Sequence, residues 1–351
     1  MYDMIPKILY MELLDNNYGN KKLDISVIDA LSDFAQVTVV TVKNWFDCSL
    51  QNVELIEYDN TCDFKNNKIN YYAIHVQNLM TARRIDKQYD FDCLFFASFH
   101  SYVMALSRFV IDRTDRIYIM HHNNIDWINN SKLGMLLFPL YKNKVNHVVL
   151  NDFIKRYLVD EFSISNSRVH VLPHPLNKER QNSQKLYNCV GISNSNDENW
   201  VRYIYDREIK SGDLEKRGLK VVLRAKSFSY SGKALKILNH YLSTDEYYSY
   251  ISSTEQMFLP FPSSFRYRMS GSIIDALSNH TKVIGSKIPV FQEFEREYPN
   301  LCHTVNSAEE FWDFLINTSG VDDDCDEEFD RFNDAHSRKK VVDCLRNIFE
   351  K

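Results

Sequence analysis

The sequence has 351 residues, of which 44% are hydrophobic and 25% are charged, and this length and balance suit two globular domains of ordinary size. Its net charge of −5 gives no global electrostatic reason to expect nucleic acid as a partner. Seven cysteines without a C-x-x-C pair argue against a disulfide framework and a thiolate zinc site, and because no apolar stretch could cross a bilayer we expect a cytoplasmic protein.

The first half of the chain alternates short apolar runs with segments of helical spacing. The runs predicted as strands are 7–14, 37–42, 53–58, 91–98, 116–122 and 147–151. The segments predicted as helices are 23–34 and 76–89. Continuous apolar runs are typical of strands that are buried on both faces, and strands that alternate with helices form parallel sheets. We therefore expect a doubly wound, Rossmann-like domain.

The second half repeats this alternation after a break. The predicted strands are 187–193, 220–225, 257–261 and 282–286, and the predicted helices are 198–209, 244–252 and 270–279. The break lies at 171–184, where two prolines precede a polar stretch of the kind found in linkers. The sequence thus predicts an α/β protein with two Rossmann-like domains, 1–178 and 179–351, that face a cleft. We expect the C-terminal helix, 337–351, to pack across the gap.

The segment FRYRMSGSIIDAL, at 265–277, leads from a predicted strand into a predicted helix. Parallel sheets bind ligands at the carboxyl ends of their strands, and the N–H groups of a helix start attract phosphate. Arginines add charge-assisted contacts to such a site, and glycine lets a ligand approach the backbone closely. The residues expected to bind the ligand here are Arg266, Arg268, Ser270, Gly271 and Ser272.

An alternative interpretation of this segment needs no ligand. Ser272 and Asp275 fit an S-x-x-D capping box, in which two side chains satisfy the N–H groups of a helix start. The segment is then a capped helix and not a binding site.

The stretch at 258–289 resembles the donor-binding segment of GT-B glycosyltransferases, especially family 4-like enzymes. It shares with them a strand ending in proline, a loop, a glycine-containing helix start, an acidic residue before alanine and a final apolar strand. The segments at 148–158 and 169–176 are similar to the last unit of that family's N-terminal domain. The resemblance implies a two-domain enzyme whose substrate is a nucleotide-sugar and which uses no separate cofactor.

The resemblance also implies roles for single residues. Asp275 would contact the donor ribose, and His121 would face the reacting sugar. Tyr267 stands where the family has its first acidic residue. The basic pair that follows the family's first C-terminal strand is missing, and we expect Arg224 and Lys226, after the next strand, to bring that charge to the donor diphosphate.

Two histidines, His121 and His122, end the predicted strand at 116–122, at the edge of the sheet where ligands bind. The alternative for such residues is a structural hydrogen bond. Asp126 is the candidate general base, or otherwise a helix cap. His100, at the end of another predicted strand, is expected to be structural.

Asp90 and Asp92 form a D-x-D pattern, but they adjoin the start of a predicted strand and so lie at the wrong edge of the sheet. We expect them to be turn residues, and because no other His, Cys and Asp group has metal-ligand spacing we expect no metal site. The apolar and basic segment at 133–144 fits either contact with a membrane that carries a lipid-linked acceptor or a buried helix interrupted by Pro139.

Together with the resemblance, these features predict a glycosyltransferase that moves a sugar from a nucleotide-sugar to a glycan or lipid-linked glycan acceptor. The resemblance implies a role in surface polysaccharide synthesis. Protein cations at the diphosphate would make a metal unnecessary, and the enzyme would work in the cytoplasm, at the inner face of the membrane where the acceptor is lipid-linked. Two alternatives stay open. One is a non-catalytic subunit of the same fold that stabilises a partner transferase, and the other is a sugar-nucleotide epimerase of similar fold.

Overall fold

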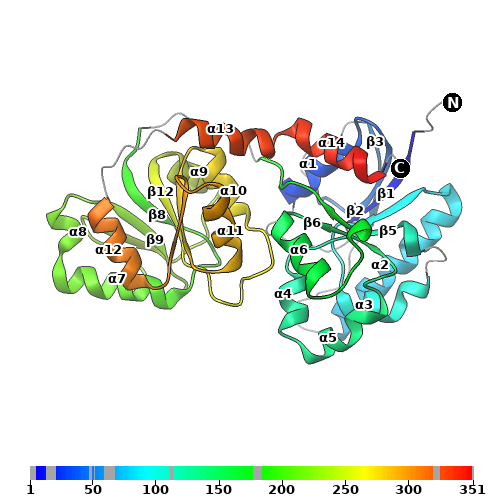
Figure 1. Ribbon diagram of the computed structural model, residues 1–351, viewed down its shortest axis with the longest axis horizontal. Coiled ribbons are helices and arrows are strands. Elements are labelled where there is room, and N and C mark those ends of the chain that lie inside the picture. The colour runs from blue at the N-terminus through cyan, green and yellow to red at the C-terminus, as the bar shows by residue number, and fades with distance from the viewer. Residues whose placement is uncertain are drawn as a thin grey trace. The chain divides into compact units, whose positions relative to one another are not determined.

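The computed structural model describes residues 5–12, 21–46, 50, 52–58, 68–110, 114–176, 184–318 and 325–349, and the chain forms two compact units (Figure 1). The first unit contains Met1–Pro175, Tyr267–Met269 and His336–Lys351. The second unit contains Leu176–Arg266 and Ser270–Ala335. The short segment Tyr267–Met269 therefore belongs to the first unit, although the residues on both sides of it belong to the second.

The first unit is built on a parallel sheet. Its strands are β1 (Lys7–Glu12), β2 (Gln36–Val42), β3 (Val53–Tyr58), β4 (Cys93–Phe96), β5 (Ile117–Met120), β6 (Asn146–Val149) and β7 (Val169–Val171), in the order β3-β2-β1-β4-β5-β6-β7. Its helices are α1 (Lys21–Leu31), α2 (Lys68–Tyr89), α3 (Ser101–Ser107), α4 (Asn124–Asn129), α5 (Lys132–Leu137), α6 (Asp152–Asp160) and α14 (Arg338–Phe349), with short 3-10 helices η1 (Arg108–Val110), η2 (Thr114–Arg116), η3 (Phe138–Leu140) and η4 (Asn166–Arg168). The strand order reverses between β1 and β4, which makes their carboxyl ends the topological switch point of this sheet.

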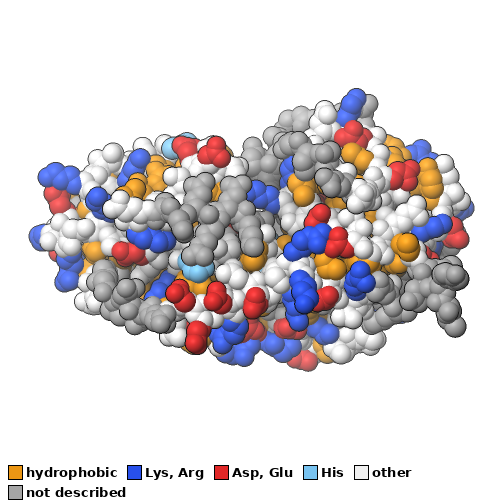
Figure 2. Space-filling model, turned by 90° about the horizontal axis from the view of Figure 1, so that it is seen from above, with side chains coloured by type: hydrophobic (Ala, Val, Ile, Leu, Met, Phe, Trp, Pro, Cys, Tyr) orange, Lys and Arg blue, Asp and Glu red, His pale blue; other side chains and the backbone are white. Residues whose placement is uncertain are grey.

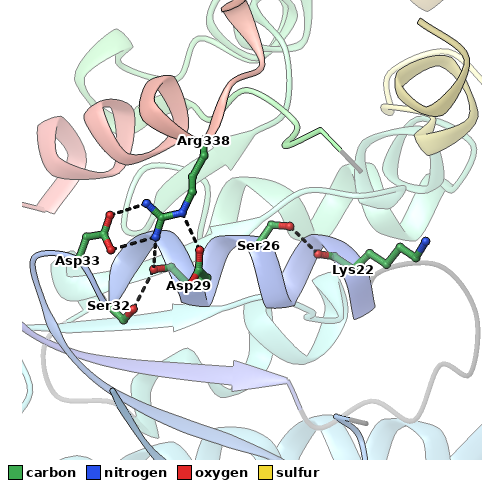
Figure 3. Close-up of polar contacts among 6 residues, drawn as sticks. All are labelled: Lys22, Ser26, Asp29, Ser32, Asp33 and Arg338. Atoms are coloured by element: carbon green, nitrogen blue, oxygen red, sulfur yellow. Dashed lines mark hydrogen bonds and ion pairs between the residues drawn. The ribbon is translucent and has the colours of Figure 1, made fainter. Parts of the chain in front are cut away.

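Helix α14 completes the core of the first unit. Its apolar stripe, which includes Val341 and Leu345, packs with α1 residues such as Val27 on one face of the sheet. At the start of α14, Arg338 bonds to Asp29 of α1 at 2.7 Å and to both carboxylate oxygens of Asp33 at 2.7 and 2.9 Å (Figure 3). Apolar packing and an ion-paired clamp thus both fix α14 to α1.

The second unit is built on a mostly parallel sheet. Its strands are β8 (Tyr187–Gly191), β9 (Val221–Arg224), β10 (Tyr230–Ser231), β11 (Leu235–Leu238), β12 (Thr254–Leu259), β13 (Lys282–Ser286) and β14 (Cys302–Val305), in the order β10-β11-β9-β8-β12-β13-β14. Its helices are α7 (Glu198–Ser211), α8 (Asp213–Lys216), α9 (Thr244–Ser252), α10 (Gly271–Ser278), α11 (Pro289–Glu297), α12 (Ala308–Thr318) and α13 (Asp326–Ala335). Only β10 runs antiparallel to its neighbour among these pairs of described strands, and the order reverses between β8 and β12.

The connection from β9 to the parallel strand β11 contains no helix. Such crossovers usually require a helix, but here residues 225–234 suffice because β10 folds back on β11 as a hairpin. Aromatic side chains take the place of the missing helix: Tyr205 of α7 packs edge-on against Phe228 and Tyr230, and the guanidinium of Arg202 lies 3.9 Å from the centre of the Phe228 ring. The sequence did not predict this hairpin.

The predicted fold class is confirmed, since each unit is a doubly wound, Rossmann-like sheet with alternating helices. Residues 13–14 of the first predicted strand and 177–183 of the predicted linker lie outside the described residues. Asp90 and Asp92 precede β4, as predicted, and Asp92 accepts the Lys7 N–H at 2.8 Å. None of the described helices has the length and apolarity that a membrane span requires. Acidic and basic side chains lie intermixed on the face seen in Figure 2.

Candidate active site

The start of α10 has no side-chain cap. Strand β12 ends at Leu259, and α10 begins at Gly271, with Ser270 as its extended N-cap residue whose side chain makes no capping bond. The capping box on Ser272 is therefore wrong, because Ser272 already lies inside the helix. A Cβ added to Gly271 would meet nothing within 4 Å, so packing within the protein does not require a glycine there. An uncapped helix start beside open space is an arrangement that suits an anion.

Asp275 lies at the centre of a buried network between α9 and α10. Its two carboxylate oxygens accept hydrogen bonds from the hydroxyls of Tyr248, at 3.0 Å, and Tyr247, at 3.2 Å. The Tyr247 hydroxyl also lies 3.2 Å from the Ser272 hydroxyl. Burial and the negative charge of Asp275 raise the pKa of Tyr247 well above its usual value, so this hydroxyl stays a donor. Sequence reasoning missed both tyrosines, although they are adjacent in a predicted helix.

Arg224 does not present its charge to solvent. It is 4% exposed at the end of β9, its Nε–H donates to the His240 carbonyl at 2.8 Å, and its guanidinium lies 4.7 Å from the centre of the Tyr241 ring. Tyr241 follows β11 and is 68% exposed. Arg224 thus holds the loop after β11 and supports an exposed aromatic ring, whereas Lys226, in the loop after β9, is exposed.

Asp126 joins two of the predicted site residues in the first unit. One carboxylate oxygen accepts the Tyr267 backbone N–H at 2.7 Å, and the other pairs with Nε of Arg268 at 3.1 Å. The Tyr267 ring stacks on Tyr157 with 3.5 Å between the ring centres. Burial lowers the pKa of Arg268, and the charge of Asp126 opposes that effect. The alternative of Asp126 as a helix cap is wrong, because Asn123 is the N-cap residue of α4.

His121 directly follows β5 and lies in a chain of buried hydrogen bonds. It is 1% exposed, and its Nε2 lies 2.8 Å from Nδ1 of His147, whose Nε2 lies 2.7 Å from the Lys142 carbonyl. A carbonyl only accepts, so we assign the proton of His147 to Nε2, and His147 Nδ1 then accepts the Nε2–H of His121. This leaves Nδ1 of His121 as an acceptor, and no described residue hydrogen-bonds to it. Burial lowers the pKa of His147 to about 4 and that of His121 well below its usual value, so both are neutral near pH 7.

Two buried acids at the switch point of the first sheet escaped sequence reasoning. Glu12, the last residue of β1, is 1% exposed and accepts the hydroxyl of Ser98, beyond the end of β4, at 2.5 Å. Asp24 of α1 is fully buried and accepts the Tyr10 hydroxyl at 2.7 Å. Burial, and then the charge of Glu12, raises the pKa of Asp24 well above its usual value. The available signal was the acidic Glu12 inside an otherwise apolar run.

His100 lies among aromatic side chains at the carboxyl ends of β4 and β5. Its ring centre is 5.0 Å from Tyr72, 5.2 Å from Tyr102 and 5.0 Å from Trp127. Burial lowers the pKa of His100 to about 4. A small cavity of about 10 Å³, which His75 and His100 help to line, adjoins this cluster and has room for about one water.

The structure brings four of the predicted site residues together as two pairs, one in each unit. Ser272 and Asp275 share the Tyr247 hydroxyl in the second unit, and Asp126 and Arg268 form an ion pair in the first. Arg266 has an exposed side chain. Among the described residues, no three His, Cys, Asp or Glu side chains gather as metal ligands would.

No family model matches this sequence, and no curated protein matches it. Solved structures do match. Sucrose-phosphate synthase from Thermosynechococcus elongatus matches at a TM-score of 0.66 with 10% identity, over 98% of each chain. A UDP-forming α,α-trehalose-phosphate synthase from Burkholderia xenovorans matches at 0.66 with 11% identity, also over 98% of each chain. HepE from Anabaena, solved with UDP and glucose, matches at 0.62 with 10% identity, over 97% of this chain and 98% of that one. With two Rossmann-like units and glycosyltransferases as its structural neighbours over nearly its whole length, the chain has the GT-B fold.

Proposed function

We propose that this protein is a glycosyltransferase that moves a sugar from a nucleotide-sugar donor to a glycan or lipid-linked glycan acceptor in surface polysaccharide synthesis. The observation that carries the proposal is the uncapped start of α10 beside the Asp275 network, in a fold whose neighbours are glycosyltransferases. The surface-polysaccharide role, and a location at the inner face of a membrane, come from the sequence resemblance and belong to the proposal.

The second unit would bind the donor. The N–H groups at the start of α10 would hold the diphosphate, aided by the exposed cations Lys226 and Arg266. Asp275 would accept a ribose hydroxyl, which requires that ribose replace or share a tyrosine hydrogen bond. The Tyr241 ring, supported by Arg224, would stack on the nucleobase, since stacking on an aromatic ring is worth about 1–3 kcal/mol per base.

The first unit would hold the reacting sugar and the acceptor. Nδ1 of His121 would accept a hydrogen bond from a sugar hydroxyl, once that hydroxyl reaches the buried ring edge. Asp126 is the predicted base, but both its oxygens are engaged, so we assign it to positioning Arg268 and the Tyr267 backbone. The buried pair Glu12 and Asp24, at the switch point of the first sheet, then becomes the proposed proton acceptor for the acceptor hydroxyl.

The departing diphosphate would be stabilised by the helix start and protein cations, so we propose that turnover needs no divalent metal. The measurement is donor consumption with and without EDTA. Activity that EDTA abolishes and Mg²⁺ or Mn²⁺ restores would contradict this part of the proposal.

The second candidate is a non-catalytic subunit of the same fold. Two observations favour it: Arg268 is paired with Asp126, and Tyr267 stands where the resemblance expects an acid. Such a subunit would bind no donor, so donor binding separates the two candidates. The third candidate, an epimerase, would convert or hydrolyse a sugar-nucleotide without any acceptor, which a donor-only assay detects.

The test is a thermal-shift screen of the purified protein against UDP, GDP, CMP and their sugars. A ligand that binds only the folded state raises the melting temperature. At a hundredfold excess over Kd it adds about 2.7 kcal/mol to the free energy of unfolding. We expect one nucleotide class to shift the transition selectively. If no nucleotide or nucleotide-sugar shifts it, the transferase proposal fails and the non-catalytic subunit takes its place.

A further inference from the structure

The first unit exposes large apolar side chains on a set of adjoining elements, and these side chains are here called the apolar patch. It is formed by residues of α2, α3, η1, α5 and η3, and these elements pack against one another side by side. Its exposed large side chains are Tyr72, Val76, Met80, Leu106, Phe109, Leu133, Met135, Leu136 and Leu140. These are nine of the fifteen exposed large hydrophobic residues among the described residues, so they are gathered and not scattered.

The exposed apolar residues of the patch are additional to those that fill the core of the first unit. In α5 and η3 the buried positions are already filled by Gly134 and Phe138, yet Leu136 is 71% exposed and Leu133 is 48% exposed. Phe109, in η1, is 74% exposed. The sequence suggested that segment 133–144 is either a membrane contact or a buried helix interrupted by Pro139. In the structure the segment has both a buried face and an exposed apolar face.

Basic residues outnumber acidic ones in the elements that form the patch, where the one acid is Asp86 of α2. Residues 68–85, 93–110 and 127–151 contain no Asp or Glu. Lys132, at the start of α5, and Lys144, after η3, are both exposed. Asp86 is neutralised by its ion pair with Arg116 at 2.7 Å. An apolar surface with exposed cations at its margin fits a bilayer that contains anionic lipids, because the apolar side chains enter the interface and the cations meet the headgroups.

We propose that the apolar patch docks this protein on an anionic lipid bilayer. Docking also accounts for the position of an aromatic cluster that begins in the patch: Tyr72 stacks with Tyr102, after β4, and Tyr102 contacts Trp127, after β5. Aromatic rings of this type prefer the boundary between headgroups and water. A lipid-linked acceptor held in the docked bilayer would then reach that edge of the sheet directly, and this last step rests on the proposed function.

The experiment is flotation of the purified full chain with vesicles, without donor or acceptor. One set is phosphatidylcholine alone, and the other contains about 30% phosphatidylglycerol, an anionic fraction that gives the surface a negative potential. We expect the protein to float with the anionic vesicles and far less with the neutral ones. The double variant Leu136→Asp, Phe109→Asp should lower the bound fraction by about tenfold or more, since it places charges in the apolar interface.

The matched control is Ile209→Asp, which alters a 53% exposed apolar side chain of α7 in the second unit. It should bind vesicles as the unchanged protein does. Lys132→Glu combined with Lys144→Glu should weaken binding to anionic vesicles and leave binding to neutral ones as it was. Nucleotide thermal shifts of every variant should equal those of the unchanged protein, so loss of docking is separable from loss of donor binding.

Three results would overturn the proposal. The unchanged protein could fail to float with either vesicle at low salt, or the double variant could float as well as the unchanged protein. The third is self-association: if sedimentation shows a dimer that the double variant dissociates, while no vesicles are bound, the patch is an interface between two copies of this chain.

Discussion

Gly271 is the residue at which ligand binding and stability can be separated most cleanly. Its backbone has no left-handed φ, and its Cβ position is open. Gly271→Ala should therefore leave the free energy of unfolding unchanged or raise it by up to about 1 kcal/mol, and the melting temperature should follow. If phosphate sits on the start of α10, the added methyl should weaken nucleotide binding about tenfold. Titration calorimetry with the nucleotide found by thermal shift measures this. Equal affinities for both proteins would place the phosphate elsewhere.

Substitutions of Asp126 can show whether this residue is a general base or positions Arg268 and the Tyr267 backbone. Asp126→Asn keeps an oxygen for the Tyr267 N–H but removes the charge that faces Arg268, so we expect a loss of about 1–2 kcal/mol in the free energy of unfolding. Asp126→Ala should cost more because it removes both contacts. Chemical denaturation and steady-state kinetics are the measurements. If turnover falls by two orders of magnitude or more while stability is unchanged, Asp126 is the general base after all.

At the level of single residues, the sequence located candidates but not their partners. The S-x-x-D pattern suggested a capping box on Ser272, yet the extended backbone of Ser270 makes Ser270 the N-cap residue, and only the folded chain shows this. His121 contacts His147 because β5 and β6 pair with Ile119 opposite His147. The spacing of residues within one segment does not predict the register between two strands. Asp275 likewise meets tyrosines from a separate helix.

At the level of elements, α14 offers a comparison between an ion pair and apolar packing. Arg338, Asp29 and Asp33 have side chains that are 54%, 55% and 38% exposed, so water and salt screen the clamp. Arg338→Ala should therefore cost only about 0.5–1 kcal/mol. Leu345→Ala removes a fully buried side chain and should cost about 2–4 kcal/mol.

Denaturation of both variants at low salt and at about 1 M salt checks this ranking, since the Debye length falls to about 3 Å there. The cost of Arg338→Ala should shrink in high salt, while that of Leu345→Ala should persist. A larger cost for Arg338→Ala than for Leu345→Ala would show that the clamp, and not the apolar stripe, fixes α14.

Strands and helices with long apolar runs were predictable because burial on both faces leaves a plain signal. The predicted helix at 244–252 coincides with α9, and the strand at 282–286 coincides with β13. The sequence did not predict β11 and β14, which are four-residue strands with a polar or charged side chain inside each. Short strands such as these take their structure from the neighbours with which they pair, so a single sequence cannot reveal them.

For the whole molecule, pH should act unequally on the two units. Burial lowers the pKa of six histidines, and all six lie in the first unit: His75 to about 3, His100, His122, His147 and His336 to about 4, and His121 well below its usual value. In the unfolded chain these histidines take up protons below about pH 6.5, but in the folded chain they do not. Stability is therefore fully present above about pH 6.5 and falls as the pH drops, by about 2 kcal/mol per histidine at pH 5. The raised pKa of Asp24 makes the folded state more stable as the pH drops, but Asp24 is one group and the histidines are six.

Calorimetry at pH 7 and pH 5, with hydrogen exchange to locate the change, tests this expectation. The first unit should lose protection at pH 5 while the second unit keeps it. A melting temperature that does not change between these pH values, or earlier loss of the second unit, would contradict the prediction.

The order of synthesis sets a limit on when the first unit can fold. Its core needs Val341, Leu345 and Phe349, which the ribosome adds only after the entire second unit. Nascent domains generally fold from the N-terminus onward as they emerge, but here the earlier domain must wait for the later one. During that interval the apolar groove that α14 will fill is open, so the unfinished first unit is a natural client for chaperones, and a fragment cut at Pro175 should be prone to aggregate.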